Sequence, residues 1–165
     1  MAELTNLETK LGEVIGLAMA AQVSTDKVIR MARKENGGLV SELEQMQREA
    51  KETEERGTEV ASSFDGKKTA ILDEAREVKQ KAQEMMKTYL DQASDSLDGF
   101  EFLTMAEAGE VGHWEILGTL NERAARSEVS ELVSWALPIQ QRHLETVRKA
   151  SLELASEEDP NEPSS

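Results

Sequence analysis

The chain of 165 residues is long enough for one domain with a buried core, and its 33 acidic and 19 basic residues give a net charge of −14. This excess of negative charge repels nucleic acid and anionic membrane surfaces, so neither is expected as a partner. The sequence contains no cysteine, which excludes disulfides, thiolate metal ligands and a cysteine nucleophile.

The first part of the chain is predicted to form a helical hairpin. Its opening, MAELTNLETKLGEVIG, has no basic and apolar leader, and no later run approaches the ~20 apolar residues of a membrane span, so a cytoplasmic protein is expected. Over residues 6–34, apolar residues recur at helical spacing. The ENGG segment at residues 35–38 should end this helix, since Asn and Gly accept the left-handed conformation. A second helix is expected over residues 39–64.

The rest of the chain is predicted to be helical as well. An amphipathic stretch at residues 70–90 precedes a second hairpin, which is formed by residues 97–123 and 128–155. Ser96 or Asp98 is expected to cap the first helix of this hairpin, and Ser127 the second. No window alternates with the period of a strand. The sequence thus predicts an all-α single domain over residues 1–155, with residues 156–165 as a disordered acidic tail.

Polar residues interrupt the apolar stripes of the second hairpin. Glu107 and Glu110 replace apolar residues on the first of its helices, and His113 lies one turn beyond Glu110. Gln140 and His143 interrupt the stripe of the second helix in the same way. A helix that is apolar on both sides of such groups should direct them into the core.

These polar residues should lie at one height in the bundle. Glu110 and His113 precede the turn at Arg126 by 16 and 13 residues, and Gln140 and His143 follow it by 14 and 17. With a rise of about 1.5 Å per residue, all four reach a similar level. We therefore expect His113 and His143 to approach each other or to share a water or an ion.

The first hairpin can add to this layer, because Glu49 lies 12 residues after the turn at Gly37. Buried carboxylates cost several kcal/mol each unless they are protonated, paired with a cation or bound to a metal. No Lys or Arg lies on the stripes at this level, which leaves His113, His143, protons, water or a metal ion. Carboxylates and imidazoles suit iron, manganese or zinc. Alternatively, Glu49 lies on the flank of its helix and is solvated.

Two hairpins with one long connection, together with the segments GEVGHWEILGTLNERA and SELVSWALPIQQRHLETV, resemble the ferritin-like superfamily, and within it small bacterial stress-associated proteins. The resemblance implies an antiparallel four-helix bundle with an additional crossover helix. Members with a di-iron or di-manganese site use two Glu residues and two Glu-x-x-His pairs. Carried over to this chain, the implied metal ligands are Glu110 and His113 in EVGH, His143 and Gln140 in QQRH, and Glu49 in EAKETEERGTEVASSF.

The chain also departs from this pattern. Ala21 and Gln22 occupy the inner face of the first helix where the family has a carboxylate, and Gln140 stands where a Glu is expected. Two functions therefore remain open, as does the question of enzymatic activity. One is a metal-binding protein with an oxidase or peroxide-consuming role in stress defence. The other is a bundle with a degenerate site that acts as a structural or partner-binding protein, as a monomer or homodimer.

Individual residues also allow two interpretations. Glu107 is either a bridging metal ligand or a carboxylate that accepts a hydrogen bond from Gln140, Gln141 or Thr25, and His143 is either a ligand or a satisfied core histidine.

Three glycines, Gly109, Gly112 and Gly118, lie inside one predicted helix, where each costs ~1 kcal/mol relative to Ala. Close packing of a neighbouring helix is the expected reason for them. A void beside the polar layer for a small ligand is the alternative.

Overall fold

The structure is a computed structural model that describes residues 2–92 and 94–164. Its regular elements in this part of the chain are all helical, which confirms the all-α prediction. They are α1 (Asn6–Glu35), the 3-10 helix η1 (Gly37–Leu39), α2 (Val40–Ser62), α3 (Lys68–Tyr89), α4 (Ser96–Ala124) and α5 (Ser127–Ser156). Among the described residues, none of these helices is long and apolar enough to cross a membrane.

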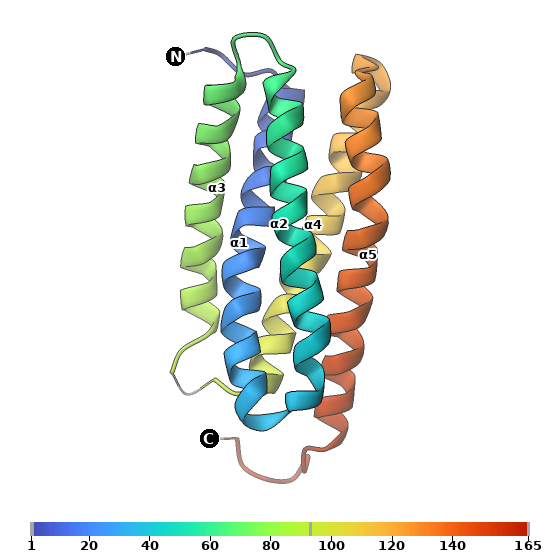
Figure 1. The fold of residues 1–165 in the computed structure, drawn as a ribbon. Coiled ribbons are helices and arrows are strands. Elements are labelled where there is room, and N and C mark those ends of the chain that lie inside the picture. Colours follow the sequence, from blue (N-terminus) through green and yellow to red (C-terminus); the bar gives the residue numbers. More distant parts are fainter. Residues whose placement is uncertain (1, 93, 165) are drawn as a thin grey trace.

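The helices run alternately up and down the long axis of the molecule (Figure 1). α1 and α2 form one hairpin and α4 and α5 form another, and the two hairpins meet where α1 contacts α4 and α2 contacts α5. Four helices thus surround a common interior. α3 connects the hairpins and packs against α1 and, less extensively, α2. It is therefore an added fifth helix on the outside of α1.

Two glycines explain how closely α3 approaches α1. A Cβ atom on Gly12 would lie 2.8 Å from the backbone oxygen of Ile71, and one on Gly16 would overlap the backbone of Ala75. These positions tolerate no side chain because α3 backbone occupies the space. α3 is thereby fixed on α1.

The helix starts differ in part from those predicted. Asp95, rather than Ser96 or Asp98, is the N-cap of α4, and Asp98 completes a reciprocal capping box with it. Ser127 does not cap α5, whose N-cap is Arg126 without a side-chain hydrogen bond. The Asn121 side chain instead holds the residue before α5 in place, by accepting from the Arg126 N–H at 3.1 Å and donating to its carbonyl oxygen at 3.0 Å.

The ENGG segment ends α1 without a left-handed residue, contrary to expectation. Asn36 has φ −141°, and the chain continues directly into η1. Positive φ values among the described residues occur at Gly66 (φ 70°), between α2 and α3, and at Ala125 (φ 53°), after α4. After α5, residues 157–164 are exposed and form turns, and their disorder stays a prediction.

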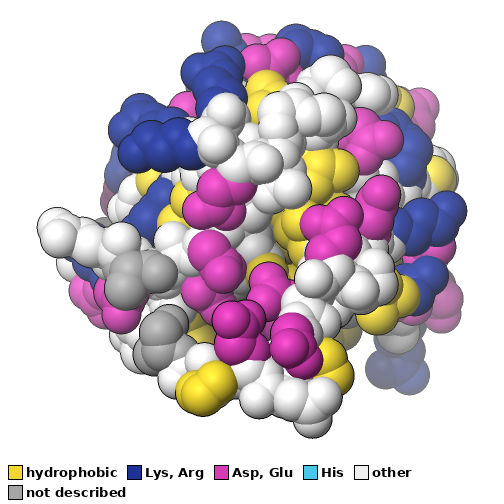
Figure 2. All heavy atoms as spheres, turned by 90° about the horizontal axis from the view of Figure 1, so that it is seen from below, with side chains coloured by type: hydrophobic (Ala, Val, Ile, Leu, Met, Phe, Trp, Pro, Cys, Tyr) yellow, Lys and Arg dark blue, Asp and Glu magenta, His cyan; other side chains and the backbone are white. Residues whose placement is uncertain are grey.

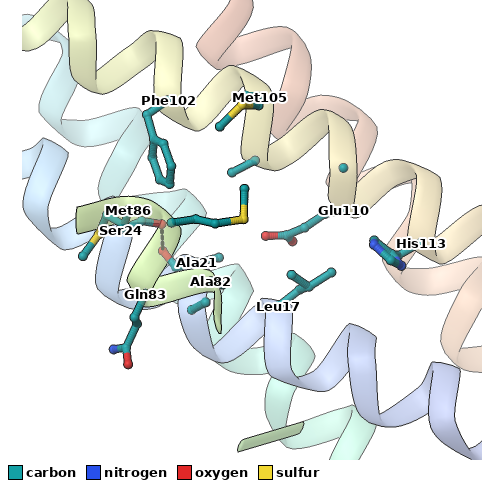
Figure 3. A pocket seen from close by; sticks show the side chains of 14 residues that line it. Leu17, Ala21, Ser24, Ala82, Gln83, Met86, Phe102, Met105, Glu110 and His113 are labelled. Carbon is teal, nitrogen blue, oxygen red and sulfur yellow. Dashed lines mark hydrogen bonds between the residues drawn. The ribbon is translucent and has the colours of Figure 1, made fainter. Parts of the chain in front are cut away.

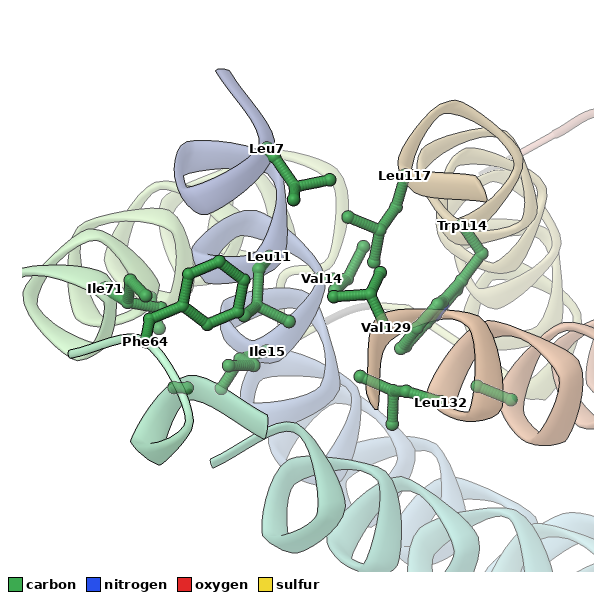
Figure 4. Packing of buried hydrophobic residues seen from close by; sticks show 13 residues of the cluster. Leu7, Leu11, Val14, Ile15, Phe64, Ile71, Trp114, Leu117, Val129 and Leu132 are labelled. Atoms are coloured by element: carbon green, nitrogen blue, oxygen red, sulfur yellow. The ribbon is translucent and has the colours of Figure 1, made fainter. Parts of the chain in front are cut away.

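The interior contains two apolar clusters, one toward each end of the bundle. The first joins the start of α1 to the end of α2 and to α3, α4 and α5, and it includes the fully buried Trp114 (Figure 4). The second is centred on Phe100 and Leu103 of α4 and includes Val28 of α1 and Val147 of α5. The polar residues singled out on α4 and α5 lie between these clusters in the sequence of both helices.

Candidate functional site

A layer of buried polar side chains separates the two apolar clusters. It is formed by Glu49 of α2, Glu107 and Glu110 of α4, and Gln140 and His143 of α5. The two carboxylates of α4 and both residues of α5 are between 1% and 4% exposed. Hydrogen bonds and ion pairs connect these five residues, so the expected common height is found for Glu49, Glu110, Gln140 and His143.

Gln140 connects the two carboxylates of α4. Its Nε2 donates to Glu107 Oε2 at 3.0 Å and also to Glu110 Oε2. Of the roles considered for Glu107, acceptance of a hydrogen bond from Gln140 is therefore the one observed. Burial, and then the negative charge of Glu107, raise the pKa of Glu110 well above its ordinary value, although the hydrogen bond from Gln140 opposes this. The fold therefore favours a proton on Glu110.

His143 lies between two carboxylates. Its Nε2 is 3.1 Å from Glu49 Oε1, and its Nδ1 is 3.8 Å from Glu107 Oε2. Burial lowers the pKa of His143, but Glu107 and Glu49 together outweigh this, and the pKa ends above its ordinary value. An imidazolium is the form of histidine that has an N–H on both ring nitrogens. The surroundings of His143 therefore favour the charged form.

Arg142 neutralises Glu49 from the outside of the bundle. Its guanidinium binds the carboxylate in bidentate fashion, with Nη1 2.9 Å from Oε1 and Nη2 close to Oε2. This hydrogen bonding holds the pKa of Glu49 below its usual range. The Glu49 side chain is 17% exposed, so it belongs to the layer and is not a solvated flanking residue. The sequence interpretation missed Arg142 because this residue is not on the apolar stripe, although its long side chain reaches the layer.

His113 does not join this layer, and the expected meeting of the two histidines is not found. Its Nδ1 lies 3.2 Å from Lys10 Nζ and 3.4 Å from Glu13 Oε2, both on α1, and its side chain is 38% exposed. No contact links it to His143 in the part of the chain that the structure describes. Burial, and then the nearby charge of Lys10, lower the pKa of His113. His113 is thus a half-buried residue on the flank of α4, and its surroundings favour the neutral imidazole.

A metal centre does not fit this donor set. Within residues 2–92 and 94–164, no three His, Cys, Asp or Glu side chains are placed to hold an ion. One physical reason is that several donor atoms already have hydrogen-bond partners. Arg142 occupies both oxygens of Glu49, and Gln140 presents N–H donors to the α4 carboxylates. An imidazolium at His143 has no lone pair for a metal.

A pocket of about 200 Å³ lies beside the layer, between α1, α3 and α4 (Figure 3). Most of the residues that line it are apolar, and Glu110 and His113 are the ionisable ones. The apolar side chains come from all three helices: Leu17, Ala20, Ala21, Ala82, Met85, Met86, Phe102, Met105 and Ala106. The exposed fractions of Met85, 51%, and Met105, 41%, show that the pocket reaches the surface.

The three glycines singled out in the sequence of α4, Gly109, Gly112 and Gly118, do not share one explanation. A Cβ atom on Gly109 or Gly112 would have no neighbour within 4 Å, so the packing explanation is wrong for both. Gly109 lines the pocket, in line with the alternative of a void beside the polar layer. Only Gly118 fits the packing explanation, since its Cβ would lie 3.3 Å from Val133 Cγ1.

The α3 side of the pocket was missed in the sequence. The signal was the Met85–Met86 pair, because two adjacent apolar residues cannot both face one neighbouring helix, and here one is exposed while the other is buried.

Compared with known protein families, characterised proteins and solved structures, the chain has no significant match. Its own residues therefore carry the argument about function.

Proposed function

We propose that this protein is a non-catalytic helical bundle that binds a small apolar ligand in the pocket between α1, α3 and α4. The observation that carries the proposal is a cavity of about 200 Å³ with mostly apolar walls, which contains one buried ionisable group, Glu110. Ligand sites in proteins typically combine apolar walls with a few polar groups that fix orientation.

The bundle is of the ferritin-like type in this proposal, with a degenerate metal site. Two hairpins joined by a long connection support that assignment, since α3 returns the chain along α1 before the second hairpin starts. The lack of a carboxylate at Ala21 and Gln22, and the amide of Gln140, support the loss of the metal. The remaining charges balance internally through Arg142, His143 and a proton on Glu110.

The size of the pocket limits the ligand. An apolar cavity of about 150 Å³ is enough to bind benzene. A cavity of about 200 Å³ that is open at one side accommodates a benzene ring with a short substituent. The ligand is expected to enter between α3 and α4, past Met85 and Met105.

A titration with ethylbenzene tests the proposal, with binding followed by thermal melting and by amide chemical shifts. Ala106→Phe should fill the pocket and abolish binding, because Ala106 lines it. Ala108→Phe is the matched control, since Ala108 is an exposed residue of the same helix outside the lining. Ethylbenzene should raise the melting temperature of the parent and of Ala108→Phe only. No binding to the parent, or undiminished binding to Ala106→Phe, would overturn the proposal.

A further inference from the structure

We propose that the pocket selects an organic cation, in which a protonated amine pairs with Glu110 while an apolar body of about eight to ten non-hydrogen atoms fills the remaining volume. This inference rests on the proposed function, because it specifies the class of ligand for the same pocket.

The first observation is the free oxygen of Glu110. Its Oε2 accepts a hydrogen bond from Gln140, whereas its Oε1 has no hydrogen-bond partner among the described residues. The residue is only 4% exposed and lines the pocket. Figure 3 shows its carboxyl group directed into the pocket, near Leu17 of α1. This oxygen is accessible from the pocket, so a ligand in the pocket can supply a partner for it.

The second observation is that every basic group near the layer pairs with a carboxylate other than that of Glu110. Arg142 binds Glu49, and His143 lies between Glu49 and Glu107. On the other side, Lys10 pairs with Glu13. No Lys, Arg or His of the described chain forms an ion pair with Glu110. A protonated amine would replace the proton of Glu110, which passes to solvent, and would pair with the carboxylate in a site where low solvent access strengthens the interaction.

The third observation is the character of the walls and of the whole chain. Met85, Met86 and Met105 offer flexible thioether side chains that adapt to an apolar body, and Phe102 offers an aromatic ring. The net charge of −14 attracts cations and repels anions of otherwise similar shape. At the end of the bundle that is lowest in Figure 1, acidic side chains gather around exposed hydrophobic side chains (Figure 2).

The experiment compares three probes of similar size by calorimetry at neutral pH: 2-phenylethylamine, neutral propylbenzene and anionic 3-phenylpropanoate. The amine should bind the parent about tenfold or more tightly than the neutral probe, and the anion should bind most weakly. Glu110→Gln should remove the preference for the amine and retain propylbenzene. Glu115→Gln is the matched control, because it removes the same charge from the exposed face of α4.

The outcomes separate the two proposals. Binding of propylbenzene without a preference for the amine would overturn the cation inference and leave the apolar pocket as the site. Failure of both propylbenzene and the amine to bind would overturn the proposed function and the inference with it. An amine preference that survives in Glu110→Gln would also overturn the inference, since the cation would then bind another carboxylate.

Discussion

Replacing His143 by alanine removes the positive charge between two carboxylates of the interior. The side chain of His143 is 2% exposed, and that of Glu107 is also 2% exposed. Removing one partner of a buried ion pair typically costs about 3–5 kcal/mol. The lower end applies here, because Glu49 keeps Arg142 as its partner and only Glu107 loses its cation. For a domain of this size, about 3 kcal/mol lowers the melting temperature by about 6–12 °C.

Urea denaturation and thermal melting of His143→Ala measure this loss. Arg142→Ala is the matched control, since the Arg142 side chain is 47% exposed and its pair should contribute only about 0–1 kcal/mol. The pKa of His143 is raised in the folded state, so its stabilising effect is complete below its ordinary pKa of 6.5 and is lost as the pH rises through the folded-state pKa. A cost below about 1 kcal/mol at acidic pH, equal to that of Arg142→Ala, would refute the reasoning.

Three further changes test other parts of the structure. Because the pKa of Glu110 is raised above 4.5, the folded state retains a proton that the unfolded chain releases, and the free energy of unfolding falls as the pH rises above 4.5. Glu110→Gln should therefore gain stability relative to the parent over this pH range in urea denaturation. Parallel pH curves for the two proteins would contradict this. Gly112→Ala should stabilise the protein by about 0.5–1 kcal/mol, whereas Gly16→Ala should destabilise it through overlap with Ala75, and the opposite order in thermal melts would count against the packing described. Chelator, or added Fe(II), Mn(II) or Zn(II), should leave the melting temperature unchanged at neutral pH, and a rise with stoichiometric metal would restore the metal-binding hypothesis.

The helices and the layer follow from simple patterns in the sequence. Helical spacing of apolar residues defines the helices, and the distances from the turn at Arg126 correctly bring Glu110 and Gln140 together across the second hairpin. Rise per residue is a constant of the helix, so height is predictable. The angular position of a side chain around the helix axis is less predictable than its height. His113 is three residues from Glu110, which rotates it toward Lys10 of α1 and away from the layer.

Other features depend on tertiary contacts that periodicity does not contain. Arg142 reaches Glu49 from outside the stripe because its side chain is long, and no pattern on α5 indicates that reach. The position of α3 depends on Gly12 and Gly16, whose four-residue spacing marks a smooth face on α1 that could have been noticed. The pocket exists because α3 follows α1 and leaves α4 uncovered near Gly109, which is a consequence of packing and not of local sequence.

We infer that His143 and a proton, rather than a metal, neutralise the buried layer. Nitrogen-detected NMR of the imidazole rings tests this claim directly, because the chain has only two histidines and His113→Gln assigns them. We expect His143 to titrate above the ordinary pKa of 6.5, with protons on both ring nitrogens below its midpoint, whereas the pKa of His113 should lie below 6.5. A His143 ring that stays neutral below pH 6.5, with one nitrogen unprotonated, would contradict the account.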